Sequence, residues 1–256
     1  MSKSYIVHSL ERGLEVLEWL AARPQEWALS EIARELGFSR GNTHKLLSAL
    51  KANNYVIQNP ENSRYKISLK LFKIGNHSIR GFDICLESRP IIKSVANALD
   101  NTVSLAVRAG DDVVCLEHAD GPTLVQTIHL RRGEHLPLYI GAAGNTLLAF
   151  LPEKERTEIL STASFKALTI HTVMEVDEIE AVLAEVRERS YCLDHSTVVL
   201  GLSALAVPVH NSSGQVAAAL VAAGFGIDFS DEHIPPKVEL LRKASKELSD
   251  RVGLFL

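Results

Sequence analysis

Three short segments of the sequence carry residue types that can catalyse reactions or bind ions. Asp194-His195-Ser196 holds the acid, base and nucleophile of a hydrolytic triad, but consecutive residues cannot direct three side chains at one reacting atom, and no Gly-x-Ser-x-Gly turn is present. Glu117, His118 and Asp120 are metal-ligand types, yet alternation along a strand sends neighbours to opposite faces. A structural zinc there stays an open alternative. Gly141-Ala142-Ala143-Gly144 precedes a predicted helix without the Lys-Ser of a phosphate loop, which favours contact with a small organic molecule over a nucleotide. No catalysis, metal or cofactor is therefore predicted.

A helix-turn-helix is predicted near the amino terminus. Apolar residues recur with helical spacing from Ser9, a plausible N-cap, to Ala22. A second helix is predicted to begin at Ser30 and to end at Gly37, since glycine tolerates the positive φ of a helix stop. After one further residue, Ser39 can cap a third helix. Two short helices joined by a glycine turn are the motif that places a recognition helix in the major groove of DNA.

A β-hairpin, or wing, is predicted after these helices. Residues 55–57 and 64–67 have strand character, and the turn-forming segment 59–63 separates them. The stretch from Leu69 to Leu99 is interrupted by three helix-breaking positions, so we expect two helices, with the domain boundary at Gly81. The interrupting residues are Gly75, Gly81 and Pro90.

The exposed face of the third helix supplies side chains suited to DNA. Arg40 and Asn42 are expected to bond base edges, whereas Ser39, Thr43 and Lys45 suit phosphate. Thr43 also falls in the inward-facing repeat of Leu46, Leu47 and Leu50, so an inward orientation stays open. Wing residues would meet the DNA backbone or minor groove. The predicted DNA contacts are Ser39, Arg40, Asn42, Thr43, His44, Lys45, Arg64 and Lys66.

The charge of the chain is unevenly distributed. Its formal net charge is -4, but residues 1–82 hold 12 Lys and Arg against 7 Asp and Glu, which makes this part about +5 and the rest about -9. The first third of the chain is therefore the part suited to a polyanion. The three cysteines have no Cys-x-x-Cys spacing, and no signal peptide or membrane-length apolar segment is found, so we expect a cytoplasmic protein.

The carboxy-terminal part reads as an α+β domain with a mostly antiparallel sheet. Strands are predicted over 103–109, 113–119, 124–130, 191–193, 203–209 and 215–224. Helices are predicted over 144–151, after Pro152, over 176–189 and over 236–252. The predicted domains are residues 1–81 and 82–256.

Several motifs in order resemble the IclR family of bacterial transcription regulators. They are Ser9–Leu17, Leu29–Ala33 with Leu36–Ser39, Thr43–Leu50, Gly133–Leu138, Ala143–Pro152 and Gly201–Val209. The resemblance implies a winged helix-turn-helix joined by a linker helix to a GAF-like effector domain, with dimers that often pair into tetramers. It also implies a regulator, more commonly a repressor. A two-fold dimer predicts a roughly palindromic double-stranded operator.

The resemblance also places an effector pocket in the second domain. Its expected lining is Ala142, Ala143, Asp194, Leu202, Ala204, Val221 and Ala223. Where relatives that bind small carboxylates place a cysteine and serines, this chain has Ala204, Val221 and Ala223, and Asn145 stands where lysine is usual. An apolar wall gives a charged ligand little in exchange for its hydration, so we expect an aromatic or weakly polar effector.

Alternative interpretations remain at this point. The small residues could be ordinary sheet core, with polar contacts supplied by backbone amides, His195 or Arg131. An enzyme tethered by a basic domain would need a convergent acid, base or nucleophile, which the sequence does not offer. A module that only binds proteins would show no salt-dependent affinity for DNA.

Overall fold

The computed structural model describes residues 7–80, 84–123 and 130–252, and the side chains of 76–80 and 252 are not described. Contacts within the chain divide it into two units, Met1–Gly81 and Phe82–Leu256. The strand predicted over 124–130 lies outside the described residues except for Leu130, and so does the break predicted at Gly81.

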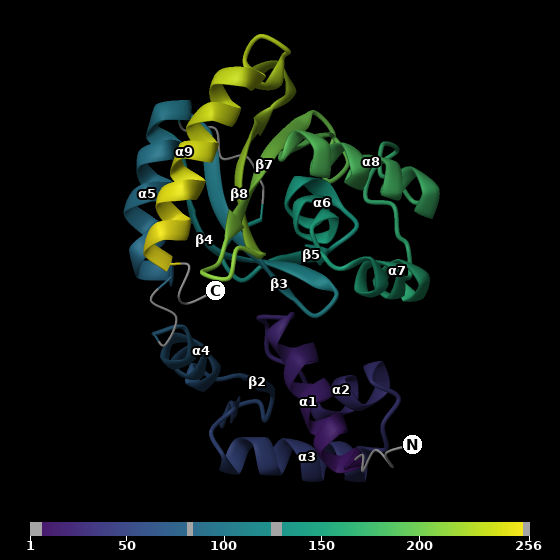
Figure 1. The fold of residues 1–256 in the computed structure, drawn as a ribbon. Coiled ribbons are helices and arrows are strands. Elements are labelled where there is room, and N and C mark those ends of the chain that lie inside the picture. The colour runs from purple at the N-terminus through teal and green to yellow at the C-terminus, as the bar shows by residue number, and fades with distance from the viewer. Residues whose placement is uncertain (1–6, 81–83, 124–129, 253–256) are drawn as a thin grey trace. The chain divides into compact units, whose positions relative to one another are not determined.

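The amino-terminal unit packs helices against a small antiparallel sheet (Figure 1). Its elements are α1 (His8–Ala21), α2 (Leu29–Glu35), α3 (Arg40–Ala52), β1 (Val56–Gln58), β2 (Tyr65–Ile67) and α4 (Lys70–Arg80). The predicted helix-turn-helix and hairpin are therefore confirmed.

The helix starts follow the sequence in one case and depart from it in two. Ser39 caps α3, since its hydroxyl accepts a hydrogen bond from the Asn42 amide at 3.3 Å. Ser9 and Ser30 do not cap: both lie inside helices that begin earlier, at His8 and Leu29. At α2 the Glu31 carboxylate instead accepts the Ala28 amide at 2.8 Å. Gly37 ends the turn with φ of +67°, as predicted.

An apolar core holds the amino-terminal unit together. Buried side chains from α1, α2, α3 and the hairpin meet in it: Val16, Leu20, Ile32, Leu46, Leu47, Val56 and Tyr65. Trp27 joins the hairpin to this core, because its backbone exchanges two hydrogen bonds with Tyr65, of 2.8 and 2.7 Å. Trp19 packs edge-on against Trp27, with ring centroids 4.8 Å apart. Helix packing thus fixes the position of the wing.

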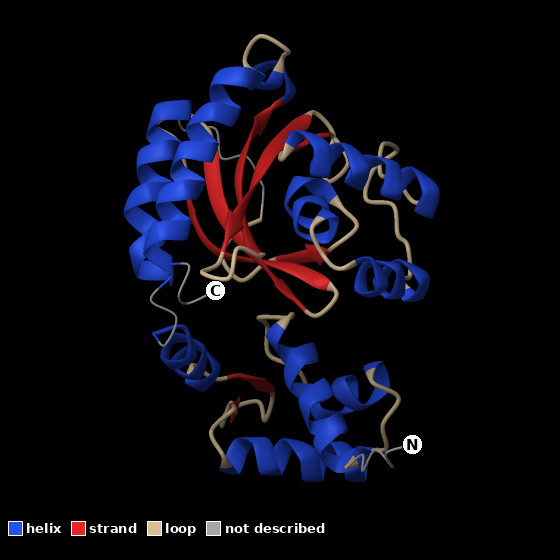
Figure 2. Ribbon diagram, in the orientation of Figure 1, coloured by secondary structure: helices blue, strands red, loops and turns tan. Residues whose placement is uncertain are grey.

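The described strands of the carboxy-terminal unit form one antiparallel sheet in the order β5-β4-β3-β8-β7-β6 (Figure 2). They are β3 (Thr102–Ala109), β4 (Asp112–Ala119), β5 (His135–Pro137), β6 (Cys192–His195), β7 (Leu202–His210) and β8 (Val216–Phe225). The helices are α5 (Ile84–Leu99), α6 (Gly141–Ala149), α7 (Glu153–Thr162), α8 (Val176–Arg189), the short 3-10 helix η1 (Gly226–Phe229) and α9 (Ile234–Val252).

Helices cover both faces of this sheet. Figure 1 shows α5 and α9 side by side on one face and α6, with α8 beyond it, on the other. Pro90 lies inside α5 and does not end it, contrary to the break predicted there. The α+β fold with a mostly antiparallel sheet is confirmed.

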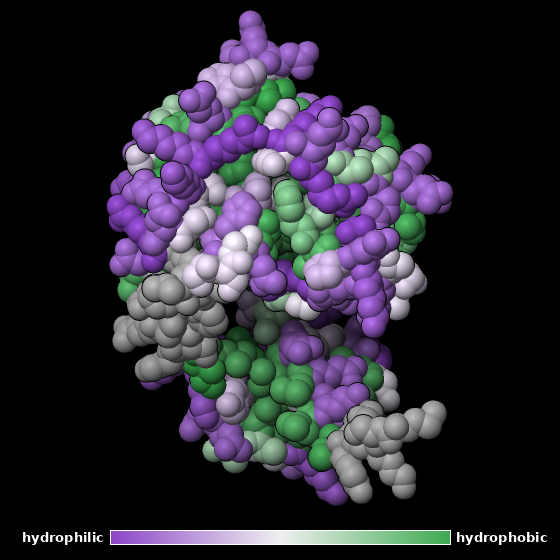
Figure 3. Space-filling view, in the orientation of Figure 1, coloured by the Kyte–Doolittle hydropathy of each residue, from purple (hydrophilic) through white to green (hydrophobic). Residues whose placement is uncertain are grey.

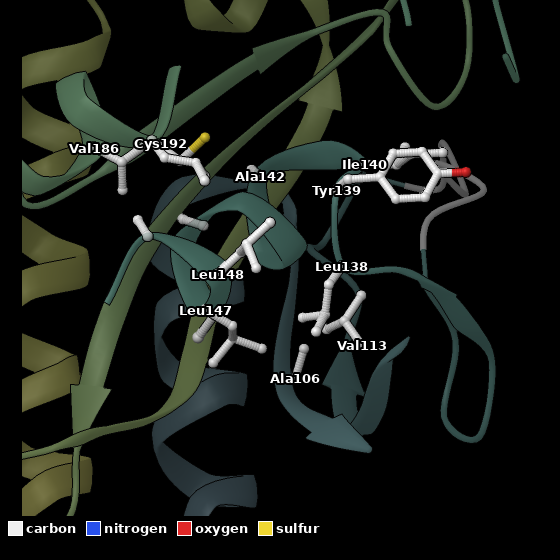
Figure 4. Packing of buried hydrophobic residues seen from close by; sticks show 14 of the residues in the cluster. Ala106, Val113, Leu138, Tyr139, Ile140, Ala142, Leu147, Leu148, Val186 and Cys192 are labelled. Carbon is white, nitrogen blue, oxygen red and sulfur yellow. The ribbon is translucent and has the colours of Figure 1, made fainter. Parts of the chain in front are cut away.

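A cluster of buried apolar side chains packs α6 against the sheet (Figure 4). Leu147 and Leu148 of α6 pack with Leu138 and with Val113 of β4. A Cβ on Gly144 would lie 2.5 Å from the Leu138 carbonyl oxygen, so only glycine lets α6 approach this segment. The close approach brings the amino end of α6 to the sheet, beside the predicted effector residues.

Candidate DNA interface and effector cavity

The amino-terminal half of α3 presents an exposed cationic face. Arg40, His44 and Lys45 are exposed, and α3 contains no acidic residue. Arg40 and His44 lie one turn apart on the same side of α3, and Lys45 follows His44, whereas Leu46 and Leu47 are buried. This arrangement suits the major groove, where arginine and lysine bond guanine and phosphate.

Thr43 does not belong to this face, which corrects its predicted role as a phosphate contact. Its side chain is 0% exposed, and its hydroxyl donates to the Ser39 carbonyl at 3.1 Å. The helical repeat that contains Leu46 and Leu47 turns Thr43 toward the core. Thr43 therefore supports the start of α3 from inside.

Asn42 lies between the exposed and the buried sides of α3. The residue is half-buried, and its amide nitrogen Nδ2 is enclosed with no hydrogen-bond partner among the described residues. Contact with a base edge requires this side chain to rotate outward. Ser39 is exposed, but its hydroxyl already serves as the helix cap.

Both predicted wing cations are engaged within the unit. Lys66 Nζ lies 2.9 Å from Glu26 Oε1, and Arg64 Nη1 donates to the Glu26 carbonyl at 3.1 Å. Arg64 is also 3.4 Å from a Glu31 carboxylate oxygen. The sequence gives no sign of these pairings, because Glu26 and Lys66 are 40 residues apart. The charges of Arg64 and Lys66 are therefore partly neutralised within the unit.

Six of the seven predicted effector residues surround one small cavity beside the amino end of α6. Its lining includes Ala142, Ala143, Asp194, Ala204, Val221 and Ala223. Leu202 is buried but does not line the cavity, which corrects that prediction. The lining that sequence reasoning missed is Ser104, Leu130, Leu136, Ile140, Gly141 and Val198. Ser104 could have been found from the pairing of β3 with β8, because it lies directly opposite Val221.

The cavity is apolar and nearly closed. Its volume is about 30 Å³, room for a water molecule but not for an organic effector. Asp194 supplies the one ionisable side chain in the lining. Burial raises the pKa of Asp194, while a hydrogen bond from the Thr197 hydroxyl opposes that rise. A ligand must therefore widen the cavity, and it would meet aliphatic walls, one hydroxyl and one acid.

Two family models match the chain. The model of the IclR helix-turn-helix domain covers residues 9–60, and that of the bacterial transcriptional regulator IclR C-terminal domain covers residues 76–250. The second match alone spans more than half of the chain. The chain belongs to the IclR family.

Two transcriptional regulators match this IclR-family chain over most of their own length. It is 29% identical over 248 residues to the HTH-type transcriptional regulator XynR of Escherichia coli strain K12, covering 97% of this chain and 98% of XynR. It is 26% identical over 246 residues to the HTH-type transcriptional repressor AllR of the same strain, covering 96% of this chain and 90% of AllR. This IclR-family protein is accordingly a DNA-binding transcriptional regulator with an effector-binding carboxy-terminal domain, and not an enzyme.

A solved structure shares the fold of this IclR-family chain. It is an IclR homolog from Microbacterium hydrocarbonoxydans complexed with 4-hydroxybenzoate, with 22% identity and a TM-score of 0.78. The match covers 94% of this chain and 98% of the solved chain. Among the described residues, no cluster of metal-ligand side chains and no helix long and apolar enough to span a bilayer occurs.

Proposed function

We propose that this regulator is a repressor that reads its operator with α3, with Arg40 at base edges and with His44 and Lys45 beside them. The exposed, acid-free face of α3 supports this assignment most directly. Asn42 joins the contact by rotating outward, and Ser39 contributes mainly as the cap. The protein would act in the bacterial cytoplasm, where the chromosome lies.

A mobility-shift assay on DNA upstream of the gene for this chain tests the proposal. Lys45→Ala should weaken the complex and lower the slope of log affinity against log salt by about 1, because one phosphate contact is lost. Arg40→Ala should cost about 1–3 kcal/mol and relax base specificity. Lys154→Ala removes an exposed lysine of α7 and serves as the matched control. An equal loss of DNA affinity in all three variants would contradict the role of α3 in DNA binding.

The same proposal includes a homodimer on a roughly palindromic operator. Large apolar side chains of the amino-terminal unit are exposed: Val7, Leu10 and Leu14 of α1 and its start, and Leu69, Phe72 and Ile74 of α4 and its start. Figure 3 shows hydrophobic surface gathered on this unit. An exposed apolar patch of this kind commonly marks a subunit interface. Phe72→Glu should shift the mass measured by light scattering toward the monomer, whereas Ile57→Glu on the hairpin should not.

We further propose that the effector is aromatic or weakly polar and that it widens the cavity when it binds. The aliphatic lining and the lack of a basic lining residue support this class. A ligand that binds the widened form more tightly shifts the protein toward that form, and this couples the cavity to DNA affinity.

Calorimetric titration separates the effector classes. The 4-hydroxybenzoate named with the Microbacterium structure is a suitable aromatic probe. Lactate is the small hydrophilic counterpart. Tighter binding of the aromatic acid, with a negative heat-capacity change from burial of apolar surface, is expected. Binding of lactate alone would overturn this effector class while leaving the DNA-binding role intact.

A further inference from the structure

A second and much larger cavity lies at the edge of the carboxy-terminal unit. Its volume is about 630 Å³, within the range of small-molecule sites. It forms where α5 and β8 end and where β3 and α9 begin. Ala223 of β8 is the one residue that lines both this cavity and the small effector cavity. The lining is otherwise separate, so a ligand here would be distinct from the effector.

Two donors on the wall of this cavity are not fully used. Asn101 is 5% exposed, and its Oδ1 accepts a hydrogen bond from Lys237 Nζ. The amide nitrogen of Asn101 donates to no described residue and is left open to a ligand. Lys237 uses one of its three donors on Asn101, and its ammonium lies 5.1 Å from the centre of the Phe229 ring. Together, Asn101 and Lys237 can bind an anionic acceptor.

Acidic side chains flank the same two residues. Asp100 is occupied, because both its oxygens accept hydrogen bonds from Thr123. Asp228 is half-buried in the lining and accepts no hydrogen bond from a described residue. With one lysine against two aspartates, the wall carries a negative charge that a cationic donor would balance. Asp228 is therefore placed to bind an ammonium group.

Gly224 brings these groups to one point. A Cβ at this position would lie 2.5 Å from Asn101 Nδ2 and 3.4 Å from Asp228 Oδ2, so the amide nitrogen and the carboxylate oxygen are less than about 6 Å apart. Only glycine leaves room for both groups here. An α-amino acid carries its carboxylate and its ammonium on one carbon atom, so a single molecule in the cavity can reach both groups.

We propose that this cavity binds a free α-amino acid. The carboxylate of the amino acid accepts from Asn101 and Lys237, its ammonium donates to Asp228, and its side chain extends into the remaining volume. The site is additional to the effector cavity and to DNA binding.

Calorimetric titration of the full-length protein tests the site with the proteinogenic amino acids, one at a time. The tightest binder is compared with the hydroxy acid and the amine that each lack one of its charged groups. Lys237→Met and Asp228→Asn are titrated beside two controls, Lys243→Met, an exposed lysine farther along α9, and Asp231→Asn, an exposed aspartate after η1. Ala204→Leu, which fills the effector cavity, shows whether the amino acid binds there instead. Thermal unfolding checks that each variant is folded.

We expect one or more amino acids to bind, with affinity at least about tenfold lower in Lys237→Met and in Asp228→Asn, because each loses a charge-assisted hydrogen bond. The two controls and Ala204→Leu should bind as the wild type does. Absence of amino-acid binding, unchanged affinity in both site variants, or equal binding of the single-charge analogues would each overturn the assignment. Loss of binding in Ala204→Leu alone would move the ligand to the effector cavity and overturn it as well.

Discussion

Lys66 Nζ lies 2.9 Å from Glu26 Oε1, and this ion pair joins the hairpin to the segment between α1 and α2. Glu26 also accepts hydrogen bonds from Asn59 and Asn62, at 2.8 and 3.0 Å. These bonds, with the charge of Lys66, lower the pKa of Glu26 from its ordinary 4.5 to about 2. One carboxylate therefore shapes the wing and neutralises a cation suited to DNA.

Glu26→Gln should lower the stability of the amino-terminal unit near neutral pH. Because the pKa of Glu26 is lower in the folded state, its contribution is complete above about pH 4.5 and is lost as the pH falls toward about 2. The difference in melting temperature between variant and wild type should shrink across that window. Tryptophan fluorescence measures it, since both tryptophans, Trp19 and Trp27, belong to this unit.

Glu61→Gln is the matched control for that measurement. Glu61 is exposed in the same hairpin turn, and its carboxylate makes no ion pair among the described contacts. A pH-independent difference for Glu26→Gln, or an equal effect of Glu61→Gln, would argue against the Glu26 network as the cause.

Thr43→Val should leave DNA affinity within about threefold of the wild type. Thr43 is buried, and valine has nearly its shape, so the loss is one hydrogen bond worth about 1 kcal/mol of stability. Ser39→Ala should cost a similar amount, because α3 loses its cap. Urea unfolding and mobility shift together measure both quantities. A strong loss of DNA binding by well-folded Thr43→Val would restore Thr43 as a contact.

Ala204→Leu should abolish the response to effector while leaving operator binding intact. The cavity of about 30 Å³ cannot hold three extra carbon atoms together with a ligand. Ala109→Leu adds the same atoms at the exposed end of β3 and should respond normally. Titration of effector against the protein–DNA complex provides the readout, and a normal response in Ala204→Leu would place the effector elsewhere.

Arg89→Met should destabilise the carboxy-terminal unit by about 1–3 kcal/mol. Arg89 of α5 donates twice to one oxygen of the buried Glu117 of β4, at 2.7 and 3.1 Å, and its removal leaves that carboxylate uncompensated. Because the Arg89 side chain is about half exposed, water screens the ion pair, and its removal costs less stability than the removal of a fully buried pair. Lys93→Met replaces an exposed lysine on the same helix, and it should leave the free energy of unfolding measured with denaturant almost unchanged. If Arg89→Met loses no more stability than the control does, water must solvate the Glu117 carboxylate in place of Arg89.

Local patterns in the sequence were sufficient to predict most helices and strands and the family. The helical repeat of the third helix, its Ser39 cap and the Gly37 stop each depend on neighbouring residues, and the structure has all three. The hairpin of β3 and β4 follows from alternation around a glycine turn. The helix over 176–189 has the bounds that its apolar spacing predicts. The resemblance to the family also placed a candidate effector pocket, and half of the residues that line the small cavity beside α6 were among those it named.

Tertiary contacts decided what each side chain is free to do. Periodicity left Thr43 between two orientations, and packing against α1 and α2 placed it inside. Glu26 neutralises Lys66 across 40 residues of sequence, a pairing that no local spacing encodes. The near closure of the cavity beside α6 and the meeting of Asn101, Asp228 and Lys237 depend on how strands and helices distant in sequence pack. Charge pairing and free volume are properties of the packed chain, so the sequence named candidate residues and the fold determined which of them remain available.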